Sequence, residues 1–327
     1  MYEKSKERTL YMREKPILYI VVPCYNEHEV LPESSKQLCS VLDKMVITGK
    51  IAEESRVVFV DDGSHDNTWE LICAEHEKRN NVLGVKLSRN EGHQNALLGG
   101  LMTVKDDCDC TVSIDADLQD DINTIEKMVD KYIEGCEIVY GVRNKRDTDT
   151  FFKRTTAVGF YKFMSMMGVD CVFNHADYRL MSRRALDELA KFPEKNLFLR
   201  GMVPLIGFKT DKVYYDRLER FAGESKYPLK KMLAFAFDGI TSFSINPIRA
   251  ISTLGSVTCL IAVIIFIVSL IRKFTGHTIV GWTSIMCSVW FLGGLQLLGI
   301  GLIGEYIGKM YKEVKNRPRY IIETYLK

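Results

Sequence analysis

The sequence lacks the cysteine pattern of a disulfide framework and that of a zinc site. Its nine cysteines are odd in number and scattered, and no two of them form a C-x-x-C pair. This usage favours a reducing compartment and argues against a structural zinc ion. Cys108 and Cys110, separated by one residue, are too close for ordinary metal-ligand spacing and are expected to be structural.

An excess of charge of one sign is also missing. The 327 residues include 44 Lys and Arg against 42 Asp and Glu, which leaves a net charge of +2. This balance excludes the broad basic field that is typical of nucleic-acid-binding proteins. Residues 1–15 are charged and contain no apolar core, so they do not predict a signal peptide.

Glycine-rich phosphate loops are absent where a nucleotide would need them. No strand of the sheet predicted below is followed by G-x-G-x-x-G or by G-x-x-x-x-G-K-[ST]. A nucleotide would therefore not be held by a Rossmann or P-loop glycine cradle.

Long apolar runs, in contrast, are present near the C-terminus. Residues 251–271 carry no charge and lie between Arg249 and Arg272, and residues 278–304 are uncharged up to Glu305. Since about 20 apolar residues span a bilayer, the sequence predicts two membrane helices, about 251–271 and 279–304. Lys and Arg gather outside these two stretches, so the positive-inside rule predicts that both termini are cytoplasmic.

The part before residue 142 alternates between two kinds of pattern. Apolar runs predict strands over 17–23, 56–61, 82–87, 111–114 and 137–141, and helical periodicity predicts helices over 29–46, 68–79, 92–105 and 122–135. This alternation predicts an α/β, Rossmann-like fold with a mostly parallel sheet that is buried on both faces.

Two segments outside this pattern are amphipathic. Residues 143–167 combine basic and aromatic side chains, which is typical of a helix at the membrane interface or of one packed on the core with a solvated basic face. Residues 228–246 form a second amphipathic candidate that leads into the first apolar stretch.

The most informative segment is 112–121, in which a strand-type run ends in Asp115-Ala-Asp117. Two carboxylates at the carboxyl end of a strand lie where α/β sheets bind ligands. With the amide of Gln119 they suit a hard divalent cation such as Mg²⁺ or Mn²⁺, which takes oxygen ligands and bridges to phosphates. A helix N-cap with acids that complement the helix dipole would explain an isolated Asp-x-Asp equally well.

Two other strand ends carry polar side chains. Tyr25 and Glu27 follow the first predicted strand, where a ring can stack on a base and a carboxylate can accept from a ribose hydroxyl. Asp62 follows the second strand and can accept from a base or a ribose, while Gly63 permits close backbone approach. A tight turn with a helix cap is the alternative interpretation of the second group.

Four motifs occur in order: Val22-Pro-Cys-Tyr-Asn-Glu27, Val60-Asp-Asp-Gly-Ser64, Leu87-Ser-Arg-Asn-Glu-Gly-His93 and Asp115-Ala-Asp-Leu-Gln-Asp120. Together they resemble the family-2 glycosyltransferases with the GT-A fold. Asn174-His-Ala-Asp-Tyr-Arg-Leu-Met181 and Glu219-Arg-Phe-Ala-Gly-Glu-Ser-Lys-Tyr227 resemble the polyprenyl-phosphate branch, related to dolichyl-phosphate mannose synthase. The resemblance covers about residues 17–315 and departs at Asp121-Ile122, where that branch often has two prolines.

The resemblance implies a role for each matching residue. The nucleoside would be held by Pro23, Tyr25, Glu27 and Asp62. The metal ion, Mg²⁺ or Mn²⁺, and through it the diphosphate, would be bound by Asp115, Asp117 and Gln119. The catalytic carboxylates would be Asp117 and Asp177. The phosphates of acceptor and donor would be bound by Arg143, Lys153, Arg154, Arg179, Arg220, Ser225 and Lys226.

The implied activity is inverting, metal-dependent transfer of a sugar from a nucleotide-sugar donor to polyprenyl phosphate, expected to be undecaprenyl phosphate. UDP-glucose is the leading donor; UDP-N-acetylglucosamine, an amino-arabinose donor and GDP-mannose remain open. The acceptor phosphate has a second pKa of about 6, so it is largely ionised at neutral pH. Whether Asp177 removes a proton or orients other groups therefore stays open.

Two other classes of protein are alternatives. A processive polysaccharide synthase usually carries Gln-x-x-Arg-Trp and more membrane spans, and this sequence has neither. A non-catalytic membrane scaffold with the same fold is the other alternative, and the intact pair Asp115 and Asp117 argues against it.

The expected organisation is an integral protein of the inner, cytoplasmic membrane. It comprises an N-terminal tail (1–16), a cytoplasmic GT-A domain (17–227), a juxtamembrane amphipathic helix (228–248), two membrane helices (249–307) and a cytoplasmic basic tail (308–327). A homo-oligomer is expected. The glycines at 293, 294, 299, 301 and 304 allow close helix packing, and residues 319–324 offer a strand to a neighbouring copy.

Overall fold

The computed structural model describes residues 15–144, 175–216, 246–274 and 281–327. They form two compact units, one with the described residues up to 216 together with 317–327, the other with the described residues between 246 and 316. The predicted N-terminal tail, except for its last two residues, and the predicted amphipathic helix 228–248, except for 246–248, lie outside the described residues.

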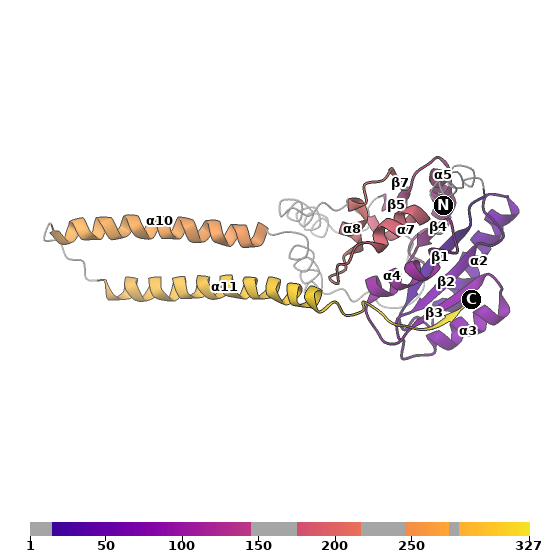
Figure 1. The fold of residues 1–327 in the computed structure, drawn as a ribbon, viewed down its shortest axis with the longest axis horizontal. Coiled ribbons are helices and arrows are strands. Elements are labelled where there is room, and N and C mark those ends of the chain that lie inside the picture. Colours follow the sequence, from indigo (N-terminus) through magenta and orange to yellow (C-terminus); the bar gives the residue numbers. More distant parts are fainter. Residues whose placement is uncertain (1–14, 145–174, 217–245, 275–280) are drawn as a thin grey trace. The chain divides into compact units, whose positions relative to one another are not determined.

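The first unit is built on one sheet. Its strands are β1 (Leu18–Cys24), β2 (Arg56–Asp61), β3 (Val82–Leu87), β4 (Cys110–Ser113), β5 (Ile138–Arg143), β6 (His175–Ser182), β7 (Thr210–Tyr215) and β8 (Ile322–Leu326). They lie in the order β7-β5-β6-β4-β1-β2-β3-β8 (Figure 1). β1 is parallel to β2 and β4, β2 to β3, and β5 to β7. The predicted α/β fold with a mostly parallel sheet is confirmed.

The helices of this unit follow the strands along the chain. They are α2 (Leu31–Ile47), α3 (Thr68–Lys78), α4 (His93–Val104), α5 (Thr124–Ile133), α7 (Arg183–Ala190) and α8 (Leu199–Leu205). Every strand and helix predicted before residue 142 is present, with ends that differ by at most two residues. The prediction succeeds there because the central strands are continuous apolar runs; all seven residues of β1 are buried.

β6 overlaps the motif at residues 174–181, yet the sequence pattern does not predict a strand there. It lies between β4 and β5 and is antiparallel to both. Its sequence places Asp177 and Arg179 among apolar residues, and both charged side chains are buried with them. The sequence of β6 therefore shows neither a continuous apolar run nor a regular alternation of apolar and polar residues, although the middle of the strand is buried.

The C-terminal tail completes the sheet of its own chain. β8 pairs antiparallel with β3, and the Ser88 N–H donates to the Ile321 carbonyl oxygen at 2.9 Å. The prediction that this tail adds a strand to a neighbouring copy is therefore wrong in this structure. The predicted tail 308–327 is also divided, since α11 extends to Lys315 and residues 317–327 belong to the first unit.

The ring of Tyr320 fixes this tail against α4. A Cβ on Gly99 would lie 3.3 Å from Tyr320 Cδ2, so the absence of a side chain at Gly99 gives the ring its close approach. The Arg319 guanidinium donates to the Phe192 carbonyl oxygen, and Lys327 pairs with Asp107 at 2.8 Å. The tail thus contacts the sheet edge, α4 and the segment after α7.

The second unit contains two long helices, α10 (Asn246–Phe274) and α11 (Trp282–Lys315). Large apolar side chains point outward on both; Ile265 is 60% exposed and Leu297 is 71% exposed. By length and composition, Phe291–Lys315 is able to cross a membrane, the one such stretch found in the part of the chain that the structure describes. The predicted span at about 279–304 overlaps it, and the span at 251–271 stays a prediction.

Only one of the five glycines of α11 singled out above touches α10. Ile251 Cγ2 would lie 3.5 Å from a Cβ on Gly299, whereas a Cβ on Gly293, Gly294, Gly301 or Gly304 would meet no described atom within 4 Å. The expected homo-oligomer stays a prediction.

We expect Tyr320→Ala to lower the free energy of unfolding by about 2 kcal/mol, because it removes a large ring packed between the tail and α4. Chemical denaturation of the detergent-solubilised protein measures this change. Tyr214→Ala, which truncates a ring that is 55% exposed on β7, is the matched control and should lose less. Equal losses in both variants would show that the ring does not secure the tail.

Candidate active site

The loops after β1 and β2 are joined at the edge of the sheet where the parallel strands end. The Asn26 N–H donates to Ser64 Oγ at 3.0 Å, and the His65 N–H donates to Asn26 Oδ1 at 2.9 Å. The Glu27 N–H donates to Thr68 Oγ1 at 3.0 Å. These bonds fix the backbone on either side of the residues that were predicted to hold a nucleoside.

Three of those four residues lie in or just after β1. Pro23 stands opposite Val60 of β2 in the sheet register. The Tyr25 side chain is 40% exposed and meets the His65 ring edge-on, with 6.3 Å between the ring centroids. Glu27 is partly buried. An exposed ring at a fixed strand end suits stacking on a base, and the role of these residues stays a prediction.

The fourth residue, Asp62, binds the backbone of the loop that precedes α4. Its two carboxylate oxygens accept from the backbone N–H groups of Glu91 at 2.8 Å and Gly92 at 2.9 Å. Beside it, Gly63 has φ +64°, and a Cβ there would lie 2.5 Å from the backbone carbon of Arg89. Burial raises the pKa of the Asp62 carboxyl, although both backbone hydrogen bonds lower it. Asp62 therefore fixes the loop that leads into α4, and any contact with a ribose would share the same oxygens.

Asp115 and Asp117 occupy the turn that follows β4. Asp117 Oδ1 accepts from the Gln119 N–H at 3.2 Å, and the intervening Leu118 has φ 54°, an unusual value for a residue with a side chain. The Asp115 side chain is 39% exposed by surface area, yet its carboxyl group lies among protein atoms. This desolvation, together with the nearby charges of Asp177, Asp120 and Asp117, raises the pKa of Asp115 to about 6, while His93 opposes the shift.

The donor set at this turn fits a hard cation. Crowded carboxylates whose negative charges raise a pKa are the groups that a divalent ion stabilises. Among the described residues, no group of three or more His, Cys, Asp or Glu side chains is arranged to hold a metal ion alone. Such a site suits an ion of the Mg²⁺ kind, which binds through one or two carboxylates and completes its shell with substrate phosphates and water.

Asp177 is held by two arginines. Arg179 Nη2 donates to Asp177 Oδ1 at 2.5 Å, and Arg200 Nη2 donates to Asp177 Oδ2 at 3.0 Å. Burial alone would raise the pKa of Asp177, but the positive charges of Arg200 and Arg179 outweigh it and hold that pKa well below its ordinary value. This lowered pKa favours the ionised form of Asp177, which makes it a poor proton acceptor and a good partner for guanidinium groups.

His93 lies between this group and the turn after β4. Its Nε2 lies 3.5 Å from Asp115 Oδ1 and 3.7 Å from Asp177 Oδ2. Although His93 ends one of the quoted motifs, sequence reasoning gave it no role. Arg200 was missed altogether, because it lies outside every motif and only the fold brings it to Asp177.

The predicted phosphate-binding arginines have protein partners in the structure. Arg143 Nη2 donates to Asp120 Oδ1 at 3.0 Å and its Nε to Tyr215 Oη at 3.2 Å. Burial opposes the charge of Arg143, yet Asp120 and Tyr215 raise its pKa above the ordinary value. Arg179 is 2% exposed and also donates to the Leu199 carbonyl oxygen at 3.3 Å. Arg179 would have to exchange these partners to bind a phosphate.

The remaining predicted phosphate-binding residues lie outside the described residues: Lys153, Arg154, Arg220, Ser225 and Lys226. Their roles stay predictions.

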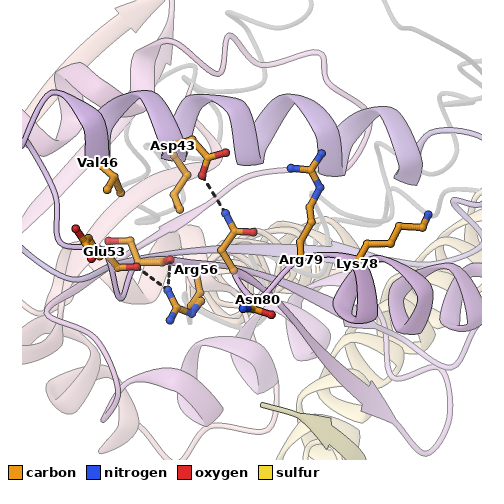
Figure 2. Close-up of a pocket in the computed structure, with 10 residues that line it drawn as sticks. Asp43, Val46, Glu53, Arg56, Lys78, Arg79 and Asn80 are labelled. Carbon is orange, nitrogen blue, oxygen red and sulfur yellow. Dashed lines mark hydrogen bonds between the residues drawn. The ribbon is translucent and has the colours of Figure 1, made fainter.

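A hollow of about 440 Å³ lies at the opposite edge of the sheet, where β2 and β3 begin (Figure 2). None of the predicted site residues lines it. Several of its polar groups have protein partners. Asn81 Nδ2 donates to Asp43 Oδ1 at 3.1 Å and Arg56 Nη1 to the Glu53 carbonyl oxygen at 2.8 Å, while Lys78 and Arg79 pair with Glu75. The predicted ligands of a nucleotide and of a metal ion therefore lie outside this hollow.

Comparison with known proteins identifies similar sequences. The model of the family described as glycosyl transferase family 2 matches residues 19–190. The chain is 58% identical to the uncharacterized glycosyltransferase YkoT of Bacillus subtilis, over 95% of this chain and 92% of that protein. It is 38% identical to the SfII prophage-derived bactoprenol glucosyl transferase of Shigella flexneri, over 93% of this chain and 96% of that protein.

The solved structures that match the chain include the mannosyltransferase PcManGT from Pyrobaculum calidifontis in complex with GDP-Man and Mn²⁺. It is 16% identical, with 97% of this chain and 94% of that chain covered and a TM-score of 0.44.

We expect Asp177→Asn to lower the free energy of unfolding by about 3–5 kcal/mol, because it leaves the buried Arg179 guanidinium without its counter-charge. Denaturant unfolding measures the loss. The matched control is Asp187→Asn, which removes a partly exposed partner of Lys105 and should lose under about 1 kcal/mol. A stability of Asp177→Asn equal to that of the control would mean that Asp177 is a dispensable partner of the arginines.

Proposed function

The chain belongs to glycosyl transferase family 2, and we propose that it transfers a sugar from a nucleotide-sugar donor to polyprenyl phosphate. UDP-glucose is the proposed donor, because relatives that are 37–38% identical are named bactoprenol glucosyl transferases. The proposed product is a polyprenyl-monophosphate sugar with inverted configuration at the sugar carbon, and undecaprenyl phosphate is the proposed acceptor.

One observation carries the proposal. The carboxylates of Asp115 and Asp177 come within 3.5 Å and 3.7 Å of a single His93 nitrogen, beside the turn that carries Asp117. This cluster lies at the carboxyl ends of the strands, where open α/β sheets bind ligands. It provides acidic ligands for a cation and basic side chains for phosphates within one small region.

In this proposal, Asp115, Asp117 and Gln119 hold Mg²⁺ or Mn²⁺. When bound, such an ion neutralises the diphosphate and stabilises the charge of the departing nucleoside diphosphate. Tyr25, Glu27 and Asp62 hold the nucleoside together with Pro23. The raised pKa of Asp115, which reflects desolvation and crowded negative charge, supports a cation at this position.

The chain's own residues have a limited chemical task in the transfer. An oxygen of the acceptor phosphate forms a bond to the sugar carbon as the bond from that carbon to the diphosphate breaks. The acceptor phosphate has a second pKa of about 6 and is already ionised, so no strong base is required. Asp177, ionised by its arginines, stabilises positive charge that develops at the sugar.

The C-terminal helices support a reaction at a membrane surface. α11 contains the stretch Phe291–Lys315, which is apolar and long enough to span a bilayer, and α10 exposes apolar side chains along its length. We propose that both helices span the inner membrane and that the catalytic unit and both termini are cytoplasmic. The basic residues outside the two apolar stretches support this orientation.

The direct test incubates the purified protein with undecaprenyl phosphate, Mn²⁺ and a panel of nucleotide sugars, and identifies the lipid product by mass. UDP-glucose should give a hexosyl phospholipid, and EDTA should prevent its formation. A product formed only from UDP-N-acetylglucosamine, an amino-arabinose donor or GDP-mannose would change the assigned sugar. The absence of a lipid product with every donor would contradict the proposed function.

We expect Asp115→Asn to lower the transfer rate at least about 100-fold, because one negative ligand of the cation is lost. The assay above measures the rate. Asp106→Asn is the matched control, since its carboxylate is 65% exposed, pairs with Lys105 and Arg183, and precedes β4, whereas the turn follows that strand. Full activity of Asp115→Asn would show that the cation is held elsewhere.

A further inference from the structure

The acceptor phosphate meets an electrostatic obstacle at this site. Asp115, Asp117 and Asp177 are all acidic, and a cation bound to the first two is already committed to the donor diphosphate under the proposed function. A second dianion would be repelled by Asp177 unless a positive side chain stood between them. We therefore expect the positive charge to come from a described residue that contacts the Asp177 carboxylate.

The two arginines on Asp177 differ in burial. Arg179 is 2% exposed and is bound both to Asp177 and to a backbone carbonyl oxygen. The Arg200 side chain is 33% exposed, and it approaches Asp177 with Nη2 at 3.0 Å and Nε at 3.4 Å. Arg179 thus supports the carboxylate from inside the protein, whereas Arg200 holds it from the side that solvent reaches.

Arg200 is also fixed in position by its backbone. It belongs to the first turn of α8, and the N–H of the preceding Leu199 donates to Gln94 Oε1 at 2.8 Å. Gln94 is next to His93 on α4, so this bond ties the start of α8 to the helix that reaches the acidic turn. An arginine whose backbone and carboxylate partner are both fixed loses little conformational freedom when it binds an anion.

Arg143, one of the arginines expected from the sequence to bind a phosphate, is placed differently. It is bound to Asp120 and to Tyr215, and Tyr215 Oη in turn donates to Asp120 Oδ1 at 2.6 Å. The Arg143 guanidinium therefore pairs with Asp120, whereas the Asp177 carboxylate is contacted by Arg179, Arg200 and His93.

We infer that Arg200 binds the phosphate group of the lipid acceptor, and that Asp177 orients the Arg200 guanidinium toward that phosphate. This inference rests on the proposed function and specifies which residue recognises its second substrate. A guanidinium beside an ionised carboxylate suits this role, because arginine N–H groups form charge-assisted hydrogen bonds to phosphate oxygens.

The test compares Arg200→Met and Arg200→Lys with the unaltered protein, and measures KM separately for undecaprenyl phosphate and for the donor. Arg200→Met should raise KM for the lipid about 10- to 100-fold, and KM for the donor should stay within about twofold. Arg200→Lys should recover part of the loss, because it restores the charge without the fork. The matched control is Arg183→Met, which breaks an exposed arginine–aspartate pair with Asp106 and should leave both KM values unchanged.

A second measurement separates this inference from the proposed function and from misfolding. Binding of undecaprenyl phosphate and of UDP with Mn²⁺ is measured directly on the same proteins in detergent. Weakened lipid binding with unchanged UDP binding supports the role of Arg200, even if no transfer to the lipid is found. Unchanged lipid binding in Arg200→Met, or weakened binding of UDP alone, would overturn it; loss of both ligands would assign Arg200 to the fold of the site.

Discussion

The charge balance around Asp177 is the interaction on which the site depends. A carboxylate buried inside a sheet is stable only with opposite charges bound to it, and Arg179 and Arg200 provide them from β6 and α8. This pairing lets an antiparallel strand with charged residues at its centre lie between two apolar strands. It also brings the start of α8 next to α4, so that Asp177, His93 and the acidic turn after β4 meet at one edge.

The rest of the first unit holds the surrounding loops in place. Asp62 binds two backbone N–H groups of the loop before α4, and the loops after β1 and β2 bind one another. From the other side, Tyr320 packs on α4 and the tail bonds to Ser88 at the end of β3. The segment that follows the second long helix is thereby part of the first unit, where it packs against the helix that carries His93.

The sequence was most informative where one pattern decided the structure. The strands β1–β5 are apolar runs, and the acids after β4 follow a run that ends abruptly, so both the sheet and the predicted cation ligands could be located. β6 was not recognisable, because Asp177 and Arg179 neutralise each other inside the fold and give no apolar signal. Arg200 and the partners of Arg143 depend on contacts between residues distant in sequence, which no local pattern encodes. The edge position of β8 was missed for the same reason, since the strand is short and its partner lies more than 200 residues earlier.

The central claim is that the turn after β4 binds a divalent cation beside the Asp177 cluster. A structure of the full chain with Mn²⁺ and UDP, recorded with anomalous scattering at the manganese edge, tests it most directly. We predict a single strong anomalous peak within coordinating distance of Asp115 and Asp117, with diphosphate oxygens completing its shell. A peak away from both carboxylates, or UDP bound at the opposite edge of the sheet, would contradict the account.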